Sequence, residues 1–218
     1  RPTNCMTVLF WDIDGTLLTT GRAGMYAWND AVRELTGHLF DLKTEIRTAG
    51  LTDYLIAVKT FEMLGLDTDL AAIEPLIRRY EELLPGSLPK RAGFVLPNVR
   101  EILEHFRQRG GARSYLLTGN TRSGARAKLT YYDLLHYFHG GVFAEDICDR
   151  STIACRALEL ATEEMAAESE RLGVLRDRLF TGLQAGVDHV SLNGPALQNH
   201  AKRLPQNLNC SFEGVDGE

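Results

Sequence analysis

The chain has few of the features that mark metal knuckles, secreted scaffolds or membrane proteins. It contains four cysteines, Cys5, Cys148, Cys155 and Cys210, and no Cys-x-x-Cys pair, so neither a zinc knuckle nor a disulfide framework is predicted. Its longest apolar stretches, such as residues 8–11, are far shorter than the ~20 residues that cross a bilayer. The first residues show no signal-peptide pattern. We therefore expect a cytoplasmic protein with reduced thiols and no membrane partner.

Basic charge is also scarce. The 24 Lys and Arg residues are outnumbered by 29 Asp and Glu residues, which leaves a formal net charge of -5, and no basic run is present. A protein that follows a phosphate backbone needs such a run, so this balance argues against a nucleic-acid partner. With 44% hydrophobic and 24% charged residues, the composition is that of a globular chain. Its 218 residues suffice for one domain of ordinary size with a small inserted module.

Apolar runs alternate with amphipathic helical patterns along most of the chain. Residues 6–11 form a nearly unbroken apolar run, which is typical of a strand buried on both faces of a parallel sheet. Further strands are predicted at residues 114–117 and 141–144. Three helices, at about residues 24–36, 52–64 and 70–84, follow the first strand before the second appears. The pattern predicts an α/β fold with a Rossmann-like parallel sheet, whose ligand crevice lies at the carboxyl ends of the strands.

Two carboxylates follow the first strand directly. Asp12 and Asp14 bracket Ile13, and the flexible pair Gly15-Thr16 comes next. One carboxylate can attack phosphorus, while the second can protonate the leaving oxygen and later activate water. Two close anions that face an anionic substrate require a cation, and Mg²⁺ prefers such oxygen ligands. The alternative is a chance Asp-x-Asp-Gly turn that ends the strand.

The surrounding motifs resemble those of a known family. Residues 12–18, Asp-Ile-Asp-Gly-Thr-Leu-Leu after an apolar strand, resemble the first motif of the haloacid dehalogenase superfamily of phosphatases. Thr118-Gly119-Asn120 resembles its second motif, and residues 49–53 resemble the cap segment of its phosphoglycolate-phosphatase-like branch. The resemblance covers about residues 6–160. It implies a Rossmann-like core of residues 1–19 and 91–218 with a helical cap inserted at residues 20–90.

The resemblance also implies a role for each matching residue. Asp12 is expected to be the nucleophile and Asp14 the general acid and base. The Asp12 side chain and the Asp14 backbone carbonyl are expected to hold Mg²⁺. Thr118 is expected to donate its hydroxyl to the phosphoryl oxygens, and Gly119 and Asn120 to bind the substrate. The implied activity is the hydrolysis of a small phosphorylated metabolite, a phosphate monoester, through an aspartyl-phosphate.

The third motif of the superfamily is a cation, normally Lys, that offsets the charge of nucleophile and phosphate. Two residues compete for this role. Arg150 follows the third strand, 32 positions beyond Thr118, whereas Lys128 comes only 10 positions beyond it and is expected on an outer helix. We favour Arg150, which can bind phosphate in a bidentate manner but departs from the usual Lys. For either residue the alternative is a solvated surface cation.

The superfamily's cap closes over the crevice and sets the choice of substrate. Arg22, Thr52, Asp53, Arg78 and Arg79 fall within the expected cap and are therefore candidates for contacting the rest of the substrate. The alternative is that they are ordinary surface residues.

The superfamily's fourth motif, an acidic turn that completes the Mg²⁺ shell, is absent. From about residue 157 to residue 218 the chain instead resembles a piece of a pyridoxal-phosphate-dependent cysteine desulfurase, for example at Leu192-Asn193-Gly194 and residues 204–209. That piece contains neither the Schiff-base Lys nor the sulfur-carrying Cys of the family. Because the two resemblances meet at residues 157–161, we hypothesise that the chain is a chimera of two genes.

The tail can still be expected to complete the sheet. A long helix followed by a strand at residues 187–192 is a crossover that could supply a fourth parallel strand, with Asn193 near the lost acidic position. Asp146 or Asp149 could instead assist through water. We therefore predict a phosphatase impaired by its missing motif. The alternatives are a non-catalytic remnant that binds phosphate or Mg²⁺ and, less favoured, a cysteine desulfurase fragment.

Overall fold

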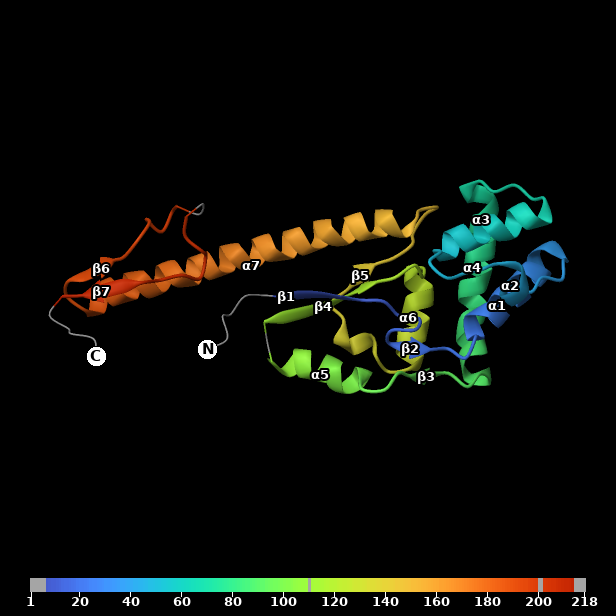
Figure 1. Ribbon diagram of the computed structural model, residues 1–218, viewed down its shortest axis with the longest axis horizontal. Coiled ribbons are helices and arrows are strands. Elements are labelled where there is room, and N and C mark those ends of the chain that lie inside the picture. Colours follow the sequence, from blue (N-terminus) through green and yellow to red (C-terminus); the bar gives the residue numbers. More distant parts are fainter. Residues whose placement is uncertain (1–6, 110, 200–201, 214–218) are drawn as a thin grey trace. The chain divides into compact units, whose positions relative to one another are not determined.

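The computed structural model describes residues 7–109, 111–199 and 202–213 (Figure 1). Its backbone contacts separate two compact units, one of residues 7–159 and one that begins at Leu160. The first unit contains the parallel sheet and most of the helices, so the predicted α/β class is confirmed. The expected division into a core (residues 1–19 and 91–218) and a cap (residues 20–90) does not correspond to these two units, and it stays a prediction.

Three parallel strands form the sheet of the first unit, in the order β1-β4-β5. They are β1 (Thr7–Trp11), β4 (Ala112–Leu117) and β5 (Gly141–Val142). Trp11 lies opposite Leu116 in the ladder, so the two strands end nearly level. The carboxyl ends of parallel strands meet at one edge, and the loops that carry the first two motifs therefore leave the sheet side by side.

The helical insertion after β1 consists of α1 (Ala23–Thr36), α2 (Leu42–Glu45), α3 (Asp53–Leu64) and α4 (Leu70–Ser87). Three of these helices were predicted from their apolar periodicity; the short α2 was not. Polar caps and glycines fix their ends: the Thr52 side chain caps α3, and Gly37 ends α1 in the left-handed conformation.

The core of the insertion is built around an aromatic pair between α1 and α4. Trp28 is only 2% exposed, and its ring centroid lies 5.1 Å from that of Tyr80. The indole Nε1 donates a hydrogen bond of 3.2 Å to Thr60 Oγ1 on α3, so the buried polar atom is satisfied. One aromatic contact and one hydrogen bond thus join three helices.

A small antiparallel pair, missed by the sequence analysis, holds together the two crossings between the sheet and the helical insertion. It consists of β2 (Leu18–Thr19) and β3 (Phe94–Val95). Gly93 precedes β3, and a Cβ atom at this position would collide with Tyr132 Oη and the backbone of Thr19. The pair therefore needs a residue without a side chain where the two crossings approach each other.

The remaining elements of the first unit connect or flank the strands. They are η1 (Leu88–Lys90), α5 (Val99–Arg109), α6 (Arg122–Tyr131) and η2 (Leu135–Tyr137). Helix α6 begins directly after the second motif, with Thr121 as its N-cap. Its first turn therefore lies at the crevice edge of the sheet.

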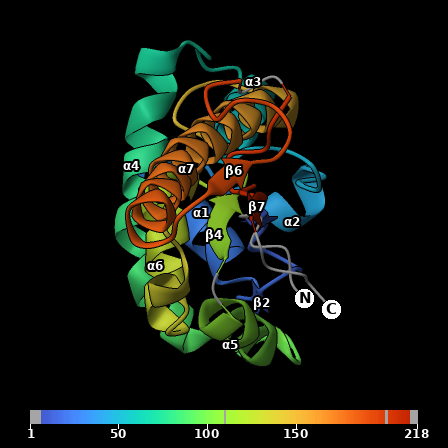
Figure 2. The same cartoon turned by 90° about the vertical axis from the view of Figure 1, so that its left-hand side faces the viewer.

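Helix α7 (Arg150–Gly186) begins in the first unit and continues into the second. Beside its C-terminal end, β6 (Val190–Leu192) and β7 (Cys210–Phe212) form an antiparallel pair (Figures 1 and 2). The predicted fourth parallel strand is thus wrong. Strand β6 instead pairs with β7, which lies further along the chain, and the two form a sheet of their own.

Two buried arginines of the second unit donate hydrogen bonds to backbone carbonyls in the segment between β6 and β7. Arg203 is 4% exposed and donates from Nε to Pro195 O at 2.6 Å and from Nη2 to Asn193 O. Arg176 donates to Leu197 O at 3.0 Å.

No helix in the described parts of the chain combines the length and apolar character required for a membrane span.

Candidate active site

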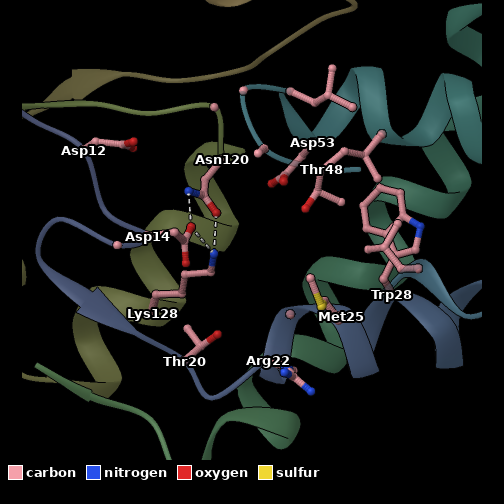
Figure 3. Close-up of a pocket in the computed structure, with 18 of the residues that line it drawn as sticks. Asp12, Asp14, Thr20, Arg22, Met25, Trp28, Thr48, Asp53, Asn120 and Lys128 are labelled. Atoms are coloured by element: carbon pink, nitrogen blue, oxygen red, sulfur yellow. Dashed lines mark hydrogen bonds and ion pairs between the residues drawn. The ribbon is translucent and has the colours of Figure 1, made fainter. Parts of the chain in front are cut away.

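A cavity of about 610 Å³ opens at the carboxyl ends of β1 and β4 (Figure 3). Its lining brings together most of the residues that the sequence analysis singled out: Asp12, Asp14, Gly119, Asn120, Lys128 and Arg150. Residues at or in the helical insertion line the opposite side, among them Arg22, Met25, Trp28 and Asp53, and Tyr80 of α4 also belongs to the lining. The crevice therefore lies where the parallel sheet predicted it.

Asp14 is held by two donors from α6 and the loop before it. Its Oδ2 accepts from Lys128 Nζ at 2.7 Å and from Asn120 Nδ2 at 2.9 Å. Burial raises the pKa of the Asp14 carboxyl, but the charge and hydrogen bond of Lys128 and the bond of Asn120 outweigh it and hold the pKa below its usual value. With 47% of its side chain accessible, Asp14 remains open to the cavity.

Lys128 occupies a different place from the one expected. The side chain is 6% accessible, and Nζ donates to Asn120 Oδ1 at 2.6 Å as well as to Asp14. Residue 128 shares a helix face with the small buried residues Gly124 and Ala125, which let α6 lie close to its neighbours. The alternative of a solvated surface cation is therefore wrong for Lys128, and the small residues one turn earlier were the signal that could have excluded it.

Asp12 is paired with the second cation. Its Oδ2 lies 3.1 Å from Arg150 Nη1, and its Oδ1 accepts from the Ile13 backbone N–H at 2.9 Å. Arg150 is the first residue of α7 and is 44% accessible, against 29% for Asp12. Each carboxylate of the first motif therefore has its own cation, and both cations face the cavity.

Thr118 and Asn120 of the second motif lie at different depths from the cavity. Thr118 is fully buried, and its hydroxyl accepts from Asn120 Nδ2 at 2.7 Å. Asn120 thus lies between Thr118 and the cavity. Gly119 contacts the start of α3, where Asp53 N donates to Gly119 O at 2.8 Å, and a Cβ atom on Gly119 would lie 2.9 Å from Leu51 O. Of the three residues, Gly119 and Asn120 line the cavity.

The model of the haloacid dehalogenase-like hydrolase family matches residues 6–186 of this chain. The chain belongs to the haloacid dehalogenase-like hydrolases. This confirms the resemblance found at its first two motifs.

Solved structures with this fold include proteins from several bacteria. CbbY from Rhodobacter sphaeroides, crystallised with phosphate, is 14% identical with a TM-score of 0.56, over 71% of this chain and 73% of that one. A predicted phosphatase from Clostridium acetobutylicum is 14% identical with a TM-score of 0.54, over 72% and 71%. A predicted phosphoglycolate phosphatase from Haemophilus somnus is 16% identical with a TM-score of 0.50, over 68% and 67%. These similarities establish the haloacid dehalogenase-like fold.

Curated relatives match a shorter stretch of the chain. Cysteine desulfurase IscS from Clostridium botulinum is 48% identical over 63 residues, which are 29% of this chain and 15% of that protein. IscS from Anaeromyxobacter is 51% identical over 63 residues, with the same shares. The chain therefore spans about 15% of the length of the curated relatives it matches. The resemblance to a cysteine desulfurase fragment is confirmed.

The candidates in the helical insertion of this hydrolase differ in their positions. Arg22 and Asp53 line the cavity, whereas Thr52, Arg78 and Arg79 are outside its lining. Thr52 donates to Cys148 O at 2.8 Å, and Arg79 pairs with glutamates on the surface. The apolar and aromatic lining of the insertion, notably Trp28 and Tyr80, was missed, because such side chains at helical spacing predict a core and nothing more.

Asp53 is the second unusual carboxylate of the hydrolase site. Its Oδ2 accepts from the Thr121 backbone N–H at 2.9 Å and so joins α3 to the start of α6. Burial raises the pKa of Asp53 to about 6, helped by the negative charges of Asp14 and Glu81 and opposed by Lys128 and the Thr121 bond. Asp53 therefore titrates in the mildly acidic range.

Replacing Asp53 by Asn is expected to stabilise the first unit at neutral pH. Because the folded-state pKa of about 6 lies above the ordinary value of 3.8, the native form holds the proton longer, and wild-type stability falls as pH rises through this window. The amide cannot ionise, so the free energy of unfolding at pH 7.5 should rise by about 1–3 kcal/mol. Urea unfolding between pH 4.5 and 7.5 measures both the gain and the flattened pH dependence.

The matched control is Asp30→Asn, because the Asp30 side chain is exposed and pairs with Arg33 one turn away. Its stability should change little at any pH. A pH dependence that is the same in Asp53→Asn and wild type would contradict the burial of a titrating carboxylate at this position.

A magnesium ion would find two residues with oxygen donors here, Asp12 and Asp14. No group of three or more His, Cys, Asp or Glu side chains that could hold a metal occurs in the described segments. Asp146 is bound by Arg156 at 3.0 Å and Asp149 caps α7 through the Thr152 N–H, and neither lines the cavity. Mg²⁺ is nevertheless often held by one or two carboxylates together with water and substrate phosphate. The donor set of Asp12 and Asp14 fits a weak magnesium site.

Proposed function

We propose that this hydrolase is a magnesium-dependent phosphatase that cleaves small phosphate monoesters through an aspartyl-phosphate, at a rate limited by its incomplete metal shell. The observation that carries the proposal is the pair of carboxylates at the end of β1, each with its own cation in one cavity. The cations offset the repulsion between the carboxylates and an anionic substrate. The substrate we propose is a phosphorylated metabolite, and the location we propose is the cytoplasm.

Asp12 is the proposed nucleophile. One carboxylate oxygen of Asp12 attacks phosphorus, and the bond from phosphorus to the leaving oxygen breaks. The leaving oxygen takes a proton from Asp14 when Asp14 is protonated and from water when it is ionised. Arg150, 3.1 Å from Asp12, is placed to bind the phosphoryl oxygens as they approach. We therefore assign the role of the third motif to Arg150.

Asp14 is the proposed acid and base, and its surroundings favour the second of these roles. Lys128 and Asn120 hold its pKa down against the effect of burial, so the carboxylate is ionised at neutral pH. It is ready to take a proton from the water that attacks the phosphoryl group, which releases phosphate and restores Asp12. The first step has less help from Asp14, so esters whose leaving oxygen needs no proton should react fastest.

The proposed metal would be held by the Asp12 side chain and the Asp14 backbone carbonyl. When bound, Mg²⁺ neutralises charge on the transferring phosphoryl group. Asp53 also lines the cavity, but in the described residues it forms no metal-holding group with Asp12 and Asp14, so the affinity for Mg²⁺ should be low without substrate.

Hydrolysis of p-nitrophenyl phosphate tests the proposal. We expect release of p-nitrophenolate that depends on Mg²⁺, saturates only at millimolar concentrations of the ion, and stops with EDTA. Turnover that is the same in EDTA would contradict the magnesium dependence. A folded chain, shown by a cooperative melt, that releases no product at any Mg²⁺ concentration would contradict the phosphatase activity.

The second candidate is a site that binds phosphate without turning it over. The lack of a third acidic metal ligand among the residues that the structure describes favours it, together with the two cations that already neutralise Asp12 and Asp14. Titration calorimetry with inorganic phosphate separates the two candidates: binding without hydrolysis supports the remnant. A cysteine desulfurase activity is the least favoured, because the match covers only 15% of those enzymes.

A further inference from the structure

The cavity is much larger than the phosphoryl group that its catalytic side would hold. At about 30 Å³ per water-sized group, the five heavy atoms of a phosphate fill about 150 Å³. The cavity measures about 610 Å³ and falls in the range of ~300–1,000 Å³ that encloses drug-sized ligands. A two-carbon leaving group would therefore leave most of this space to water.

The side of the cavity opposite Asp12 and Asp14 carries an apolar wall, flanked by the polar residues Arg22, Thr48 and Asp53. Met25, Trp28, Leu42 and Ile56 line it, and Figure 3 shows Met25 and Trp28 across from Asp14 and Lys128. The indole Nε1 of Trp28 is already bound to Thr60, so the tryptophan has no donor left for a ligand. A wall of this kind favours a leaving group with a flat or compact apolar body, since its burial removes apolar surface from water.

Arg22 differs from the other two cations that line the cavity, Lys128 and Arg150. Arg22 lines the cavity and an adjoining hollow of about 370 Å³, and its side chain has no hydrogen bond or ion pair with any described residue. Lys128 and Arg150 are each paired with a carboxylate. In the hollow, Asp41 Oδ1 already accepts from Asn29 and from Lys43 N. Arg22 therefore has its charge available for a ligand.

The backbone of Arg22 is also unusual. Its φ of 70° lies in the left-handed region, which residues other than Gly rarely adopt. Such strain persists mainly where the surroundings or the function require it. Here it places an arginine at the junction between β2 and α1, where the helical insertion begins.

We propose that the leaving group is a ring-sized, largely apolar alcohol or phenol that carries a second anionic group, which Arg22 binds. The proposal rests on the proposed function only in placing the phosphoryl group beside Asp12. The apolar body lies against Met25, Trp28 and Ile56. Arg22 is thus a specificity-determining residue.

Phenyl phosphate and 4-carboxyphenyl phosphate are matched probes, with phosphoglycolate as the two-carbon comparison. In the wild type we expect kcat/KM for phenyl phosphate to exceed that for phosphoglycolate by at least about 10-fold. The ratio of kcat/KM for 4-carboxyphenyl over phenyl phosphate should fall by about 10-fold in Arg22→Asn, as for the loss of one ion pair in a cavity. Asn tolerates the left-handed backbone, and Arg22→Lys should restore part of the ratio.

Arg33→Gln is the control, because Arg33 is an exposed arginine of α1 that pairs with Asp30. It should keep the wild-type ratio. An unchanged ratio in Arg22→Asn, or phosphoglycolate as the best of the three substrates, would overturn the proposal. If the wild type hydrolyses none of the three, the proposed function fails, and calorimetric Kd values for the same compounds test the Arg22 contact separately with the same expected ratios.

Discussion

Asp12→Asn is expected to lower kcat for p-nitrophenyl phosphate by at least ~1,000-fold, because an amide cannot act as the nucleophile toward phosphorus. The substitution keeps the shape of the side chain and an oxygen to accept from Ile13 N. Arg150 is partly exposed and can be solvated when its partner loses charge. The thermal midpoint should therefore stay close to that of the wild type while turnover is lost.

Two further variants make this result specific. Asp12→Ala should be equally inactive and cannot regenerate an aspartate by slow deamidation. Asp30→Asn, at an exposed site on α1, should keep the wild-type rate. If Asp12→Asn and Asp12→Ala both retained wild-type turnover, the nucleophile would be another group, and the assignment of the first motif would be wrong.

Lys128→Met is expected to affect stability and activity together. The substitution keeps the length and most of the volume of a side chain that is 6% accessible, but it leaves Asp14 with Asn120 as its remaining partner in the crevice. We expect a loss of about 1–3 kcal/mol in the free energy of unfolding, less than for a fully buried pair because Asp14 is partly solvated. The rate should fall by at least ~100-fold, since Asp14 loses the charge that keeps it ionised.

Arg150→Met provides the contrast between the two cations. Both members of the Arg150–Asp12 pair are partly accessible, so the stability should change by less than about 1 kcal/mol. KM for the phosphate ester should rise, because the phosphoryl oxygens lose a donor. Urea unfolding and steady-state kinetics of both variants measure these effects. A reversed pattern, with stability lost in Arg150→Met and kept in Lys128→Met, would contradict the assigned roles.

The double variant Lys128→Met/Asp14→Asn tests the pair itself. Removing both charges should recover most of the stability lost in Lys128→Met, because neither member of the pair is left as a charge without its partner. Additive losses would mean that the two side chains contribute independently.

The local sequence was sufficient where one short segment decides its own structure. The apolar run before Asp12 predicted β1, and the carboxylates that follow it were expected at the crevice because parallel strands share a carboxyl edge. The periodicity of residues 24–36 and 52–64 predicted α1 and α3 nearly to the residue, since one apolar face per helix is visible in the spacing alone.

Contacts between distant segments required the tertiary structure. Lys128 and Asp14 are 114 positions apart, so nothing near either residue indicates that they meet. Asp53 likewise looks like an ordinary first-turn helical residue, and its raised pKa depends on the segments that bury it.

The sequence by itself determined the family and the class of fold, and it predicted that Asp12 and Asp14 lie at the crevice, because these depend on motifs of a few adjacent residues. The tertiary structure alone decided that Lys128 is buried against Asp14, that Arg22 is left unpaired in the described chain, and that β6 pairs with β7 instead of joining the parallel sheet. The physical reason is that burial and strand pairing depend on which distant segments of the chain pack against a residue. Composition and local spacing do not indicate which segments these are.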